Sequence, residues 1–440
     1  MDTNYKELVD RKNITVGVIG LGYVGLPLVL ASTARGFRTI GFDIDQTKVD
    51  MLMDGKSYLK HIPVESIEKL KKSGLFDATS DFTNLKSVDA IIICVPTPLT
   101  THREPDMTYI VSTAESIYPH LKRGHIVILE STTYPGTTDE VLLTILEKSG
   151  LICGKDFYLA YSPEREDPGN ETYSTSTIPK VLGGYNQETC ERAAYLYQQI
   201  FVEVVPVSST RVAEAVKLTE NIFRSVNIAL VNELKMIFSK MDIDIWEVID
   251  AAKTKPFGFM PFYPGPGLGG HCIPIDPFYL TWKAREYECP TRFIEIAGEI
   301  NTSMPTYVVQ ILMDALNKKG KALKNARILV IGLAYKKDVD DLRESPSLKL
   351  LEIITEKGAV VDYHDPFIPN IKMTRDYKKF AGRVSVDLSP ETIRQYDALL
   401  ISTAHSTIDY HELVKHAQLV VDTRNATKDV KQGKEKIVKA

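Results

Sequence analysis

A glycine-rich turn near the N-terminus constrains the fold of this chain more than any other feature. An apolar run at residues 15–19 leads into a GxGxxG sequence at 20–25, and an apolar helical pattern follows. The next apolar run, at 39–42, ends in Asp43. Strand, glycine turn, helix and acid together form the fingerprint of a dinucleotide-binding βαβ unit, and an acid at position 43 favours NAD over NADP. We expect contacts to the cofactor from Gly20, Gly22, Tyr23, Val24, Gly25, Asp43 and Lys48.

Three further apolar runs predict strands of a parallel sheet, and polar residues follow each run. The runs lie at 89–95, 125–129 and 157–161. Ligands of such sheets bind beyond the carboxyl ends of the strands, although turn and N-cap chemistry would explain the same residue types. After the third run, Glu164 is a candidate general base and Arg165 a candidate phosphate partner, unless both belong to a solvated acidic turn. After the first two runs, the candidates for contact with cofactor or substrate are Thr97, Glu130, Thr132 and Thr133.

A long helix is predicted from about residue 209 to 241, because this stretch has helical periodicity and contains no proline or glycine. Lys217 and Asn221 are four residues apart, so they share one face of the helix. An ordinary polar face would explain both residues, but two-domain dehydrogenases commonly place catalytic groups on such a helix. A helix of this length is also typical of a subunit interface, and we expect a homodimer or a higher homo-oligomer through it.

A loop at 263–278 carries the strongest candidate for covalent chemistry. Cys272 follows a run with four glycines and two prolines, and Asp276 stands four residues later. Glycines let the backbone approach a ligand closely, and prolines stiffen its path. A thiol at the end of such a loop is well placed to be a nucleophile. The alternative is a buried structural cysteine, since free cysteine packs like a small hydrophobe.

The C-terminal third repeats the pattern of the first. Its apolar runs at 327–334, 358–365, 397–402 and 418–423 mirror those near the N-terminus, but the GxGxxG sequence is missing. Lys336, Lys337 and Arg343 lie in the corresponding loop and are candidates for phosphate contacts, against the alternative of plain surface charge. The prediction is an α/β protein with two Rossmann-like, doubly wound parallel-sheet domains joined by a long central helix. We place these domains at 1–208 and 319–440, with a helical domain at 209–318.

Composition excludes several classes of protein. The net charge of −4 argues against a nucleic-acid or membrane-surface binder, and no apolar run reaches membrane-spanning length. The N-terminal residues show no signal-peptide pattern. Five scattered cysteines contain no CxxC pair, so they favour a reducing cytoplasm and indicate no metal site.

Taken together, these motifs resemble the nucleotide-sugar 6-dehydrogenases, the family of UDP-glucose and UDP-N-acetylhexosamine dehydrogenases. The resemblance extends from about residue 14 to about 426 and rests on GLGYVGLP, ESTTYPGT, YSPERxxPG, EAVKLTEN, PGPGLGGHCIPIDP and AYKKDxxDLRESP. It implies oxidation of a sugar C6 alcohol to the acid with two NAD⁺. The cysteine loop and residues 255–259 look most like the UDP-N-acetylglucosamine branch. The His-Pro-Arg element of the N-acetylmannosamine branch is missing near Pro256 and Phe257, as is the nucleotide-contacting arginine of UDP-glucose enzymes.

The resemblance also implies roles for individual residues. Cys272 would form a thiohemiacetal and then a thioester with the sugar, while Lys217 and Asn221 stabilise the oxyanions. Glu164 would activate the hydrolytic water, and Thr133 would orient it. Asp276 would hold an ordered water or take part in a proton transfer. Asp43 would bind the adenosine ribose. Lys337 and Arg343 would contact the substrate and the cofactor. The substrate-binding residues implied are Glu164, Arg165, Lys217, Asn221, Phe262, Tyr263, Gly265, Gly269 and Lys337.

Other functions remain open at this point. The substrate could be UDP-glucose, UDP-ManNAc or UDP-GalNAc. A two-electron hydroxyacid dehydrogenase would share the first domain and the helix, but it needs neither Cys272 nor a second nucleotide domain. A non-catalytic NAD-sensing protein leaves the clustered polar residues unexplained. A hydrolase that uses His271 and Cys272 leaves the dinucleotide fingerprint unused.

Overall fold

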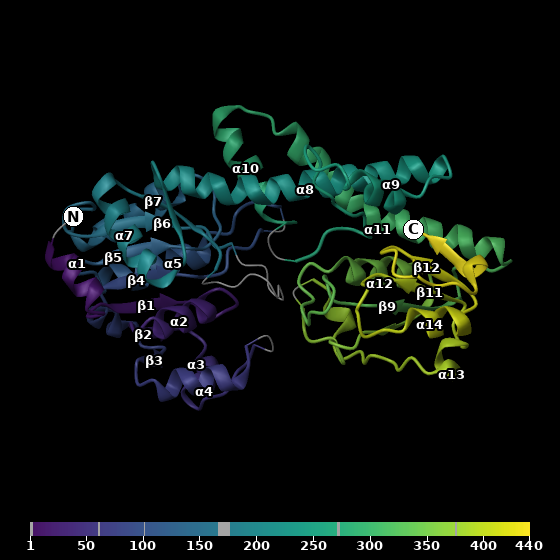
Figure 1. Cartoon of the computed structure of the whole chain (residues 1–440), viewed down its shortest axis with the longest axis horizontal. Coiled ribbons are helices and arrows are strands. Elements are labelled where there is room, and N and C mark those ends of the chain that lie inside the picture. Colours follow the sequence, from purple (N-terminus) through teal and green to yellow (C-terminus); the bar gives the residue numbers. More distant parts are fainter. Residues whose placement is uncertain (1–2, 60–61, 101, 166–176, 271–272, 375) are drawn as a thin grey trace. The chain divides into compact units, whose positions relative to one another are not determined.

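The computed structural model describes residues 3–59, 62–100, 102–165, 177–270, 273–374 and 376–440. The chain divides into two compact units, each built around one sheet. The first unit comprises residues 1–220 and 278–289, and the second comprises residues 221–277 and 290–440 (Figure 1).

An eight-stranded sheet forms the centre of the first unit, in the order β3-β2-β1-β4-β5-β6-β7-β8. Neighbouring strands are parallel except β6 and β7, which pair antiparallel. The strand order reverses between β1 and β4, which is the switch point where doubly wound sheets bind ligands. The strands are β1 Thr15–Ile19, β2 Arg38–Phe42, β3 Phe76–Thr79, β4 Ala90–Ile93, β5 Ile126–Leu129, β6 Tyr158–Tyr161, β7 Lys180–Gly184 and β8 Val204–Val207.

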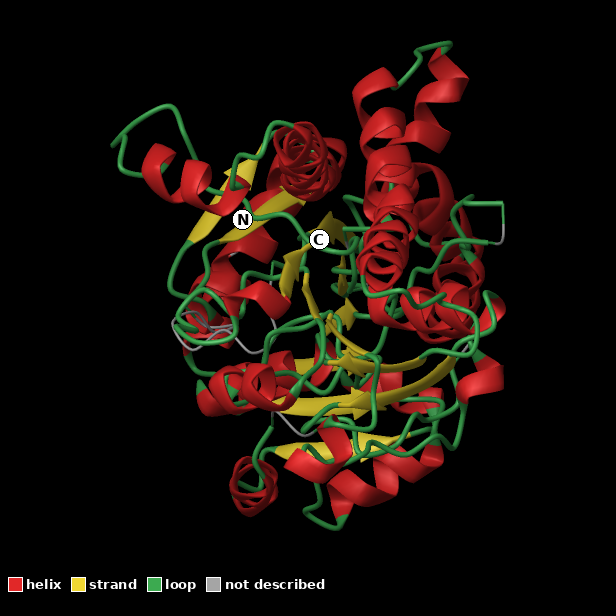
Figure 2. Cartoon of the chain, turned by 90° about the vertical axis from the view of Figure 1, so that its right-hand side faces the viewer, coloured by secondary structure: helices red, strands yellow, loops and turns green. Residues whose placement is uncertain are grey.

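Continuous apolar runs make this sheet a buried layer, because strand β1 and strands β4 to β8 each contribute residues to two cores. In β4, Ile92 belongs to one core while Ile91 and Ile93 belong to the other. Helices therefore cover both faces of the sheet (Figure 2). The first core is closed by α1 Thr3–Asp10, α2 Gly25–Ala34, α3 Gln46–Met53, α4 Val64–Lys72 and α7 Gln187–Ile200. The second is closed by α5 Thr108–Ile117 and α6 Leu143–Leu146.

The second unit holds a five-stranded parallel sheet in the order β10-β9-β11-β12-β13. Its strands are β9 Arg327–Ile331, β10 Val360–His364, β11 Ala398–Ile401, β12 Val420–Asp422 and β13 Ile437–Lys439. Residues of β9 alternate between two cores, so this sheet is also covered on both faces. One face packs on α11 Arg292–Lys318 and α12 Pro346–Glu356, and the other on α13 Pro390–Ile393 and α14 Tyr410–His416.

The predicted repeat is visible in the backbone hydrogen bonds after the first strand of each sheet. In the first unit the Gly20 amide donates to the Phe42 carbonyl at 2.7 Å, and in the second the Gly332 amide donates to the His364 carbonyl at 2.8 Å. Both glycines have positive φ, at 91° and 81°. The predicted fold of two Rossmann-like sheets is therefore confirmed.

The long central helix, α8, spans Thr210–Lys240 and begins in the first unit and ends in the second. It agrees with the predicted range because no proline or glycine interrupts it. In the second unit it is followed by α9, Ile245–Ala252, while α10, Asp276–Ala284, begins in the second unit and ends in the first. Among the described residues, no helix combines the length and apolarity that a bilayer crossing requires.

Candidate active site

The glycine turn after β1 has the geometry that a dinucleotide needs. A Cβ on Gly20 would lie 2.5 Å from the Cys94 carbonyl oxygen, and a Cβ on Gly25 would lie 1.9 Å from the Gly20 carbonyl oxygen. Both positions therefore require glycine. A Cβ on Gly22 would meet no atom within 4 Å, so the backbone there borders open space at the N-terminus of α2. Tyr23 and Val24 complete the turn and pack partly against the core. These features fit a pyrophosphate held by backbone amides.

Asp43 lies at the carboxyl end of β2, where the fingerprint places the acid that binds ribose hydroxyls. Its buried carboxylate accepts hydrogen bonds from the amides of Leu21 and Asp45, each at 3.0 Å. Lys48 Nζ donates to the same carboxylate at 3.2 Å. The predicted pair of cofactor residues thus forms a salt bridge. Because two backbone amides hold the acid in place, its position does not depend on that salt bridge.

The loops after β4 and β5 hold the threonines and the glutamate that were predicted there. Thr97 is buried, and its carbonyl oxygen accepts a hydrogen bond from Tyr279 Oη of α10 at 2.9 Å. Thr132 is half-buried. The hydroxyl of buried Thr133 donates to the hydroxyl of Thr137.

Glu130 is engaged inside the first unit. Lys180 Nζ and Tyr197 Oη each donate to one of its carboxylate oxygens, both at 2.6 Å. All three side chains are buried. A structural role at the end of β5 therefore accounts for both oxygens of this carboxylate.

Glu164 and Lys217 meet in the first unit. Lys217 Nζ donates to the backbone carbonyl of Glu164 at 2.5 Å and lies 3.4 Å from its carboxylate. Both side chains are almost fully buried. Because removal from water makes isolated charges costly, this cation and this acid stabilise each other. Arg165 instead pairs with Glu220 at 2.6 Å, and it donates to the Pro179 carbonyl at 2.8 Å.

Asn221 and Asp276 meet in the second unit. Asn221 Nδ2 donates to Asp276 Oδ2 at 2.6 Å, and both side chains are buried. Asn221 lies one helical turn after Lys217 on α8. The predicted nucleophile Cys272 and its neighbour His271 lie outside the described residues. Asp276 is the first residue of α10. Among the predicted catalytic residues that the structure describes, it lies nearest to Cys272 in the sequence.

The loop before Cys272 is fixed by contacts within the second unit. Phe262 packs edge-on against Phe223, and Tyr263 Oη donates to Asp250 at 2.7 Å. The amide of Gly265 donates to Asn232 Oδ1 at 3.0 Å.

Two glycines of this loop have close neighbours. A Cβ on Gly265 would lie 2.3 Å from Arg424 Nη1, and a Cβ on Gly269 would lie 2.6 Å from Tyr335 Cβ. Glycine at these positions thus allows the loop to pass close to Arg424 and Tyr335.

The loop after β9 carries the cations predicted to contact the substrate and the cofactor. Arg343 forms a two-pronged salt bridge with Asp341, with contacts of 2.7 to 3.1 Å. Lys337 is exposed and lies 3.9 Å from Asp338.

The acid that corresponds to Asp43 in this unit is Asp365. It accepts hydrogen bonds from the Leu333 and Ala334 amides and contacts His405 Nε2 at 3.0 Å. Burial raises its pKa, but the hydrogen bonds from His405 and the two amides outweigh burial and hold the pKa below its usual value. A buried histidine thus contacts Asp365, where Lys48 contacts Asp43 in the first unit.

Sequence reasoning missed His405 and Arg424. His405 follows β11, and Arg424 follows β12, where its Nε donates to the Ser402 carbonyl at 2.8 Å. The rule that ligand-facing residues follow the carboxyl ends of parallel strands applies to both positions.

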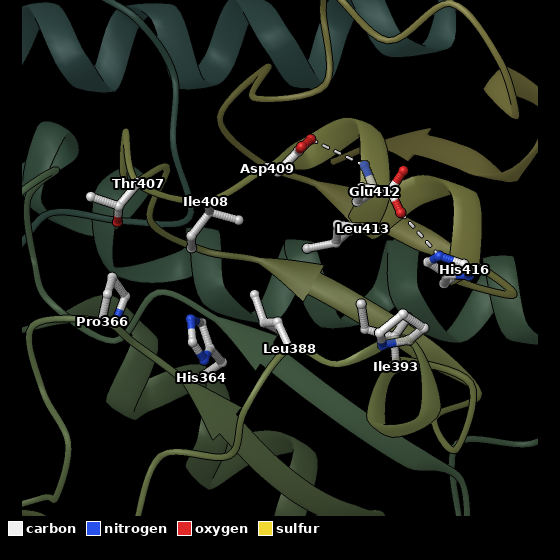
Figure 3. A pocket seen from close by; sticks show the side chains of 11 residues that line it. His364, Pro366, Leu388, Ile393, Thr407, Ile408, Asp409, Glu412, Leu413 and His416 are labelled. Atoms are coloured by element: carbon white, nitrogen blue, oxygen red, sulfur yellow. Dashed lines mark hydrogen bonds and ion pairs between the residues drawn. The ribbon is translucent and has the colours of Figure 1, made fainter.

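A cavity of about 480 Å³ lies within the second unit, beside α14 (Figure 3). None of the predicted site residues lines it. Its walls are formed by His364, Pro366, Leu388, Pro390, Ile393, Thr407, Ile408, Asp409, Glu412, Leu413 and His416. Within the described ranges, no group of three His, Cys, Asp or Glu side chains could hold a metal ion.

The fold and the glycine turn define an NAD-binding dehydrogenase with a second Rossmann-like domain. Three consecutive segments match models of one family. Residues 14–201 match the NAD binding domain of the UDP-glucose/GDP-mannose dehydrogenase family, residues 211–303 its central domain, and residues 329–429 its UDP binding domain. The chain belongs to this family, and NAD is its cofactor.

Relatives of similar identity to this chain are named for different substrates. The chain is 38% identical to the UDP-N-acetyl-D-glucosamine 6-dehydrogenase of Pseudomonas aeruginosa, over 90% of this chain and 91% of that protein. It is 35% identical to the UDP-N-acetyl-D-mannosamine dehydrogenase of Escherichia coli strain K12, over 93% of this chain and 98% of that protein. A solved structure of a UDP-D-ManNAc dehydrogenase from Pyrococcus horikoshii superposes with a TM-score of 0.86 at 31% identity, covering 97% of this chain and 98% of that one.

Proposed function

We propose that this chain oxidises the C6 hydroxyl of UDP-N-acetylglucosamine to the carboxylic acid in two NAD-dependent steps. The observation that carries the proposal is the pairing of two neighbouring polar residues of α8 with buried carboxylates. Lys217 contacts Glu164, and Asn221 contacts Asp276. Membership of a family whose models pair an NAD binding domain with a UDP binding domain supports the substrate class.

Lys217 and Asn221 act on the oxygen of the reacting carbon. The C6 hydroxyl loses its proton through the ordered water or proton transfer that Asp276 serves. The ammonium and amide groups stabilise the negative charge of the resulting alkoxide. NAD⁺, held by the glycine turn at 20–25 and by Asp43, would supply the hydride acceptor for both oxidation steps. Because both side chains are buried, their hydrogen bonds act at low dielectric, where they are stronger than in water.

Cys272 retains the half-oxidised sugar. Its thiolate forms a C–S bond with the C6 aldehyde, and the resulting thiohemiacetal oxyanion is again stabilised by Lys217 and Asn221. Nearby cations lower a thiol pKa and so increase the attacking thiolate fraction. Loss of a second hydride from C6 leaves a thioester.

Glu164 and Thr133 complete the reaction. The hydroxyl of Thr133 orients a water molecule, and the Glu164 carboxylate takes a proton from that water. The resulting hydroxide adds to the carbonyl carbon of the thioester. The C–S bond then breaks, the thiolate of Cys272 leaves, and the sugar acid is released. Asp276 serves proton transfer near the thiol. The balance is one alcohol, one water and two NAD⁺ converted to one carboxylic acid, two NADH and two protons.

Cofactor and substrate contacts are assigned to different groups. Asp43 and Lys48 would hold the adenosine ribose, with the glycine turn at 20–25 on the pyrophosphate. Arg343 and Lys337 would reach cofactor and substrate from the loop after β9. The segment 262–269 would line the substrate, and the chain would work as NAD-binding (1–208), central (209–318) and UDP-sugar-binding (319–440) domains.

A homodimer through α8 is part of the proposal. Phe223, Leu230 and Ile237 are seven residues apart on this helix and are each about half exposed. A seven-residue spacing aligns them on one stripe. An exposed apolar stripe of this kind is typical of a surface that a second copy of the chain covers.

The substrate assignment is tested with a panel of UDP-sugars. The panel contains UDP-N-acetylglucosamine, UDP-N-acetylmannosamine, UDP-N-acetylgalactosamine and UDP-glucose. We expect kcat/KM to be highest for UDP-N-acetylglucosamine. The mannosamine sugar is the second candidate, because relatives named for it are of similar identity. A clear preference for UDP-glucose would overturn the assignment to the N-acetylhexosamine branch.

A further inference from the structure

A buried carboxylate on α8 has no part in the chemistry proposed above. Glu214 is fully buried (0% exposed) and lies three residues before Lys217, in the first unit. Buried acids are rare unless hydrogen-bonded, because removing a carboxylate from water is costly. The partners of Glu214 therefore indicate what this acid is kept for.

All three hydrogen bonds of Glu214 come from one turn after β5. Its Oε2 accepts from the Gly136 amide at 2.6 Å, and its Oε1 accepts from the Thr138 amide at 2.9 Å and the Thr138 hydroxyl at 2.7 Å. This turn opens the π-helical segment Thr137–Leu142, which has no side-chain cap of its own. Glu214 thus supplies, from a different helix, the acceptors that the first amides of this segment need.

The held turn controls the placement of Thr133. Just after Thr133 the chain forms a turn, in which the Thr137 amide donates to the Tyr134 carbonyl at 3.1 Å. Gly136 in this turn has a φ of +107°. Thr137, between the two residues that Glu214 holds, accepts a hydrogen bond from the Thr133 hydroxyl. Glu214 therefore connects Thr133, through this turn, to the stretch of α8 that carries Lys217.

We propose that Glu214 is a positioning residue, whose carboxylate holds the 136–138 turn so that Thr133 stays aligned with Lys217 during the reaction. This inference rests on the proposed function, since that function gives Thr133 and Lys217 their roles. Glu214 touches neither substrate nor cofactor in this scheme. It acts through the turn.

The charge of Glu214 costs stability at alkaline pH, and its three hydrogen bonds offset only part of that cost. Asp139 and Glu140 lie in the segment it holds, and Arg211 pairs with both of them rather than with Glu214. Burial raises the pKa of Glu214 to about 7 from an ordinary value of 4.5, although the bonds from Thr138 and Gly136 lower it. The stability that this group contributes is therefore present below pH 4.5 and lost as pH rises through about 7. A neutral isostere should be no less stable at pH 8.

The test compares the native protein with Glu214→Gln and with Glu140→Gln. Glutamine keeps the volume of Glu214 but replaces one acceptor with a donor. Glu140 is an exposed acid of the same segment whose oxygens bind Arg211 and Lys283, so its variant controls for general charge loss. We measure kcat, both KM values and melting temperature between pH 5.5 and 9, together with amide exchange of Gly136 and Thr138.

For Glu214→Gln we expect kcat to fall by roughly tenfold to a hundredfold, as misplacement of a catalytic group by about 1 Å does. Both KM values should stay within about twofold, and the melting temperature at pH 8 should not fall, because the costly buried charge is gone. The native kcat should decline below about pH 7, where Glu214 becomes protonated, and the variant should lack this decline. Glu140→Gln should keep kcat within about twofold of native.

Two outcomes would overturn the inference. One is a Glu214→Gln protein with native kcat and the native acidic decline. The other is unchanged amide exchange at Gly136 and Thr138, which is informative whatever the activity. If the glutamine variant does not fold, Thr138→Ala removes one of the three bonds, and it should lower kcat by a few-fold while Glu140→Gln does not. A native protein inactive on every UDP-sugar would contradict the proposed function, whereas an active native enzyme with an unimpaired glutamine variant contradicts only the role of Glu214.

Discussion

Lys217 and Asn221 lie one helical turn apart on α8, and each side chain contacts a buried carboxylate. Their four-residue spacing places them on one face of the helix. The Lys217–Glu164 contact was not predictable from the helix, because Glu164 comes 53 residues earlier in the sequence, after β6. The salt bridge between Arg165 and Glu220 was also not predictable, since Glu220 is one of many polar residues on that helix.

Replacing Glu164 should trap the covalent intermediate. In Glu164→Gln the backbone carbonyl that binds Lys217 remains, so the oxidation steps continue, but the base that activates water is lost. With NAD⁺ and UDP-N-acetylglucosamine we expect a sugar adduct by intact mass spectrometry, and turnover about a hundredfold or more below native. The double variant Glu164→Gln with Cys272→Ala is the control and should carry no adduct. If the single variant also shows none, Glu164 is not the hydrolytic base.

Replacing Lys235 should change stability rather than activity. This amine is 3% exposed and has no hydrogen-bond partner within the described part of the chain. It lies over the rings of Trp246 and Tyr307, at 5.3 and 5.8 Å. Burial, and then the charge of Arg424, lower its pKa from 10.5 to about 7. Below pH 7 the amine is charged in both states, and burying that charge lowers the free energy of unfolding. This loss of stability shrinks as pH rises from 7 toward 10.5, because the buried amine becomes neutral.

We therefore expect Lys235→Met to raise the free energy of unfolding at pH 6 by on the order of 3 kcal/mol, and by much less at pH 10. Urea unfolding at the two pH values measures the difference. Lys240→Met, at the exposed end of the same helix, should change stability by less than about 0.5 kcal/mol. A gain at Lys235 that is independent of pH would mean that the amine is not the source of the penalty.

At the scale of elements, apolar runs predicted the strands at the centre of each sheet and missed β3, β7, β8 and β13. The strands β1, β4, β5 and β9 lie within predicted runs. Strand β7 was missed because it begins with Lys180, whose charge hides the pattern. That lysine is buried only because Glu130 pairs with it from the end of β5. The antiparallel pairing of β6 and β7 was also unpredictable, since a run of apolar residues carries no information on strand direction.

The helix α8 offers a test of the proposed homodimer. Leu230 is 50% exposed at the centre of the apolar stripe. An aspartate there would leave a charge buried in the interface, so Leu230→Asp should shift the protein from dimer to monomer. Light scattering after size exclusion measures the mass. Val384→Asp, an equally drastic change at another exposed site, should leave the dimer intact. A Leu230→Asp protein that remains dimeric would place the interface elsewhere.

At the scale of the whole molecule, the repeat explains why one chain has two nucleotide-type units with different ligands. Both units have a glycine with positive φ after the first strand and an acid after the second. Both acids are buried, but the basic side chain that contacts the acid is Lys48 in the first unit and His405 in the second. The sequence predicted the repeat and the missing glycines. It could not predict the histidine, which approaches Asp365 only after folding.

The number of NADH molecules formed per sugar tests the central claim most directly, since Cys272 matters only if one sugar is oxidised twice before release. With limiting UDP-N-acetylglucosamine and excess NAD⁺, absorbance at completion should give two NADH per sugar for the native protein. Cys272→Ala should fall well short of two and leave aldehyde behind. One NADH per sugar from the native protein, or two from Cys272→Ala, would contradict a thioester on Cys272.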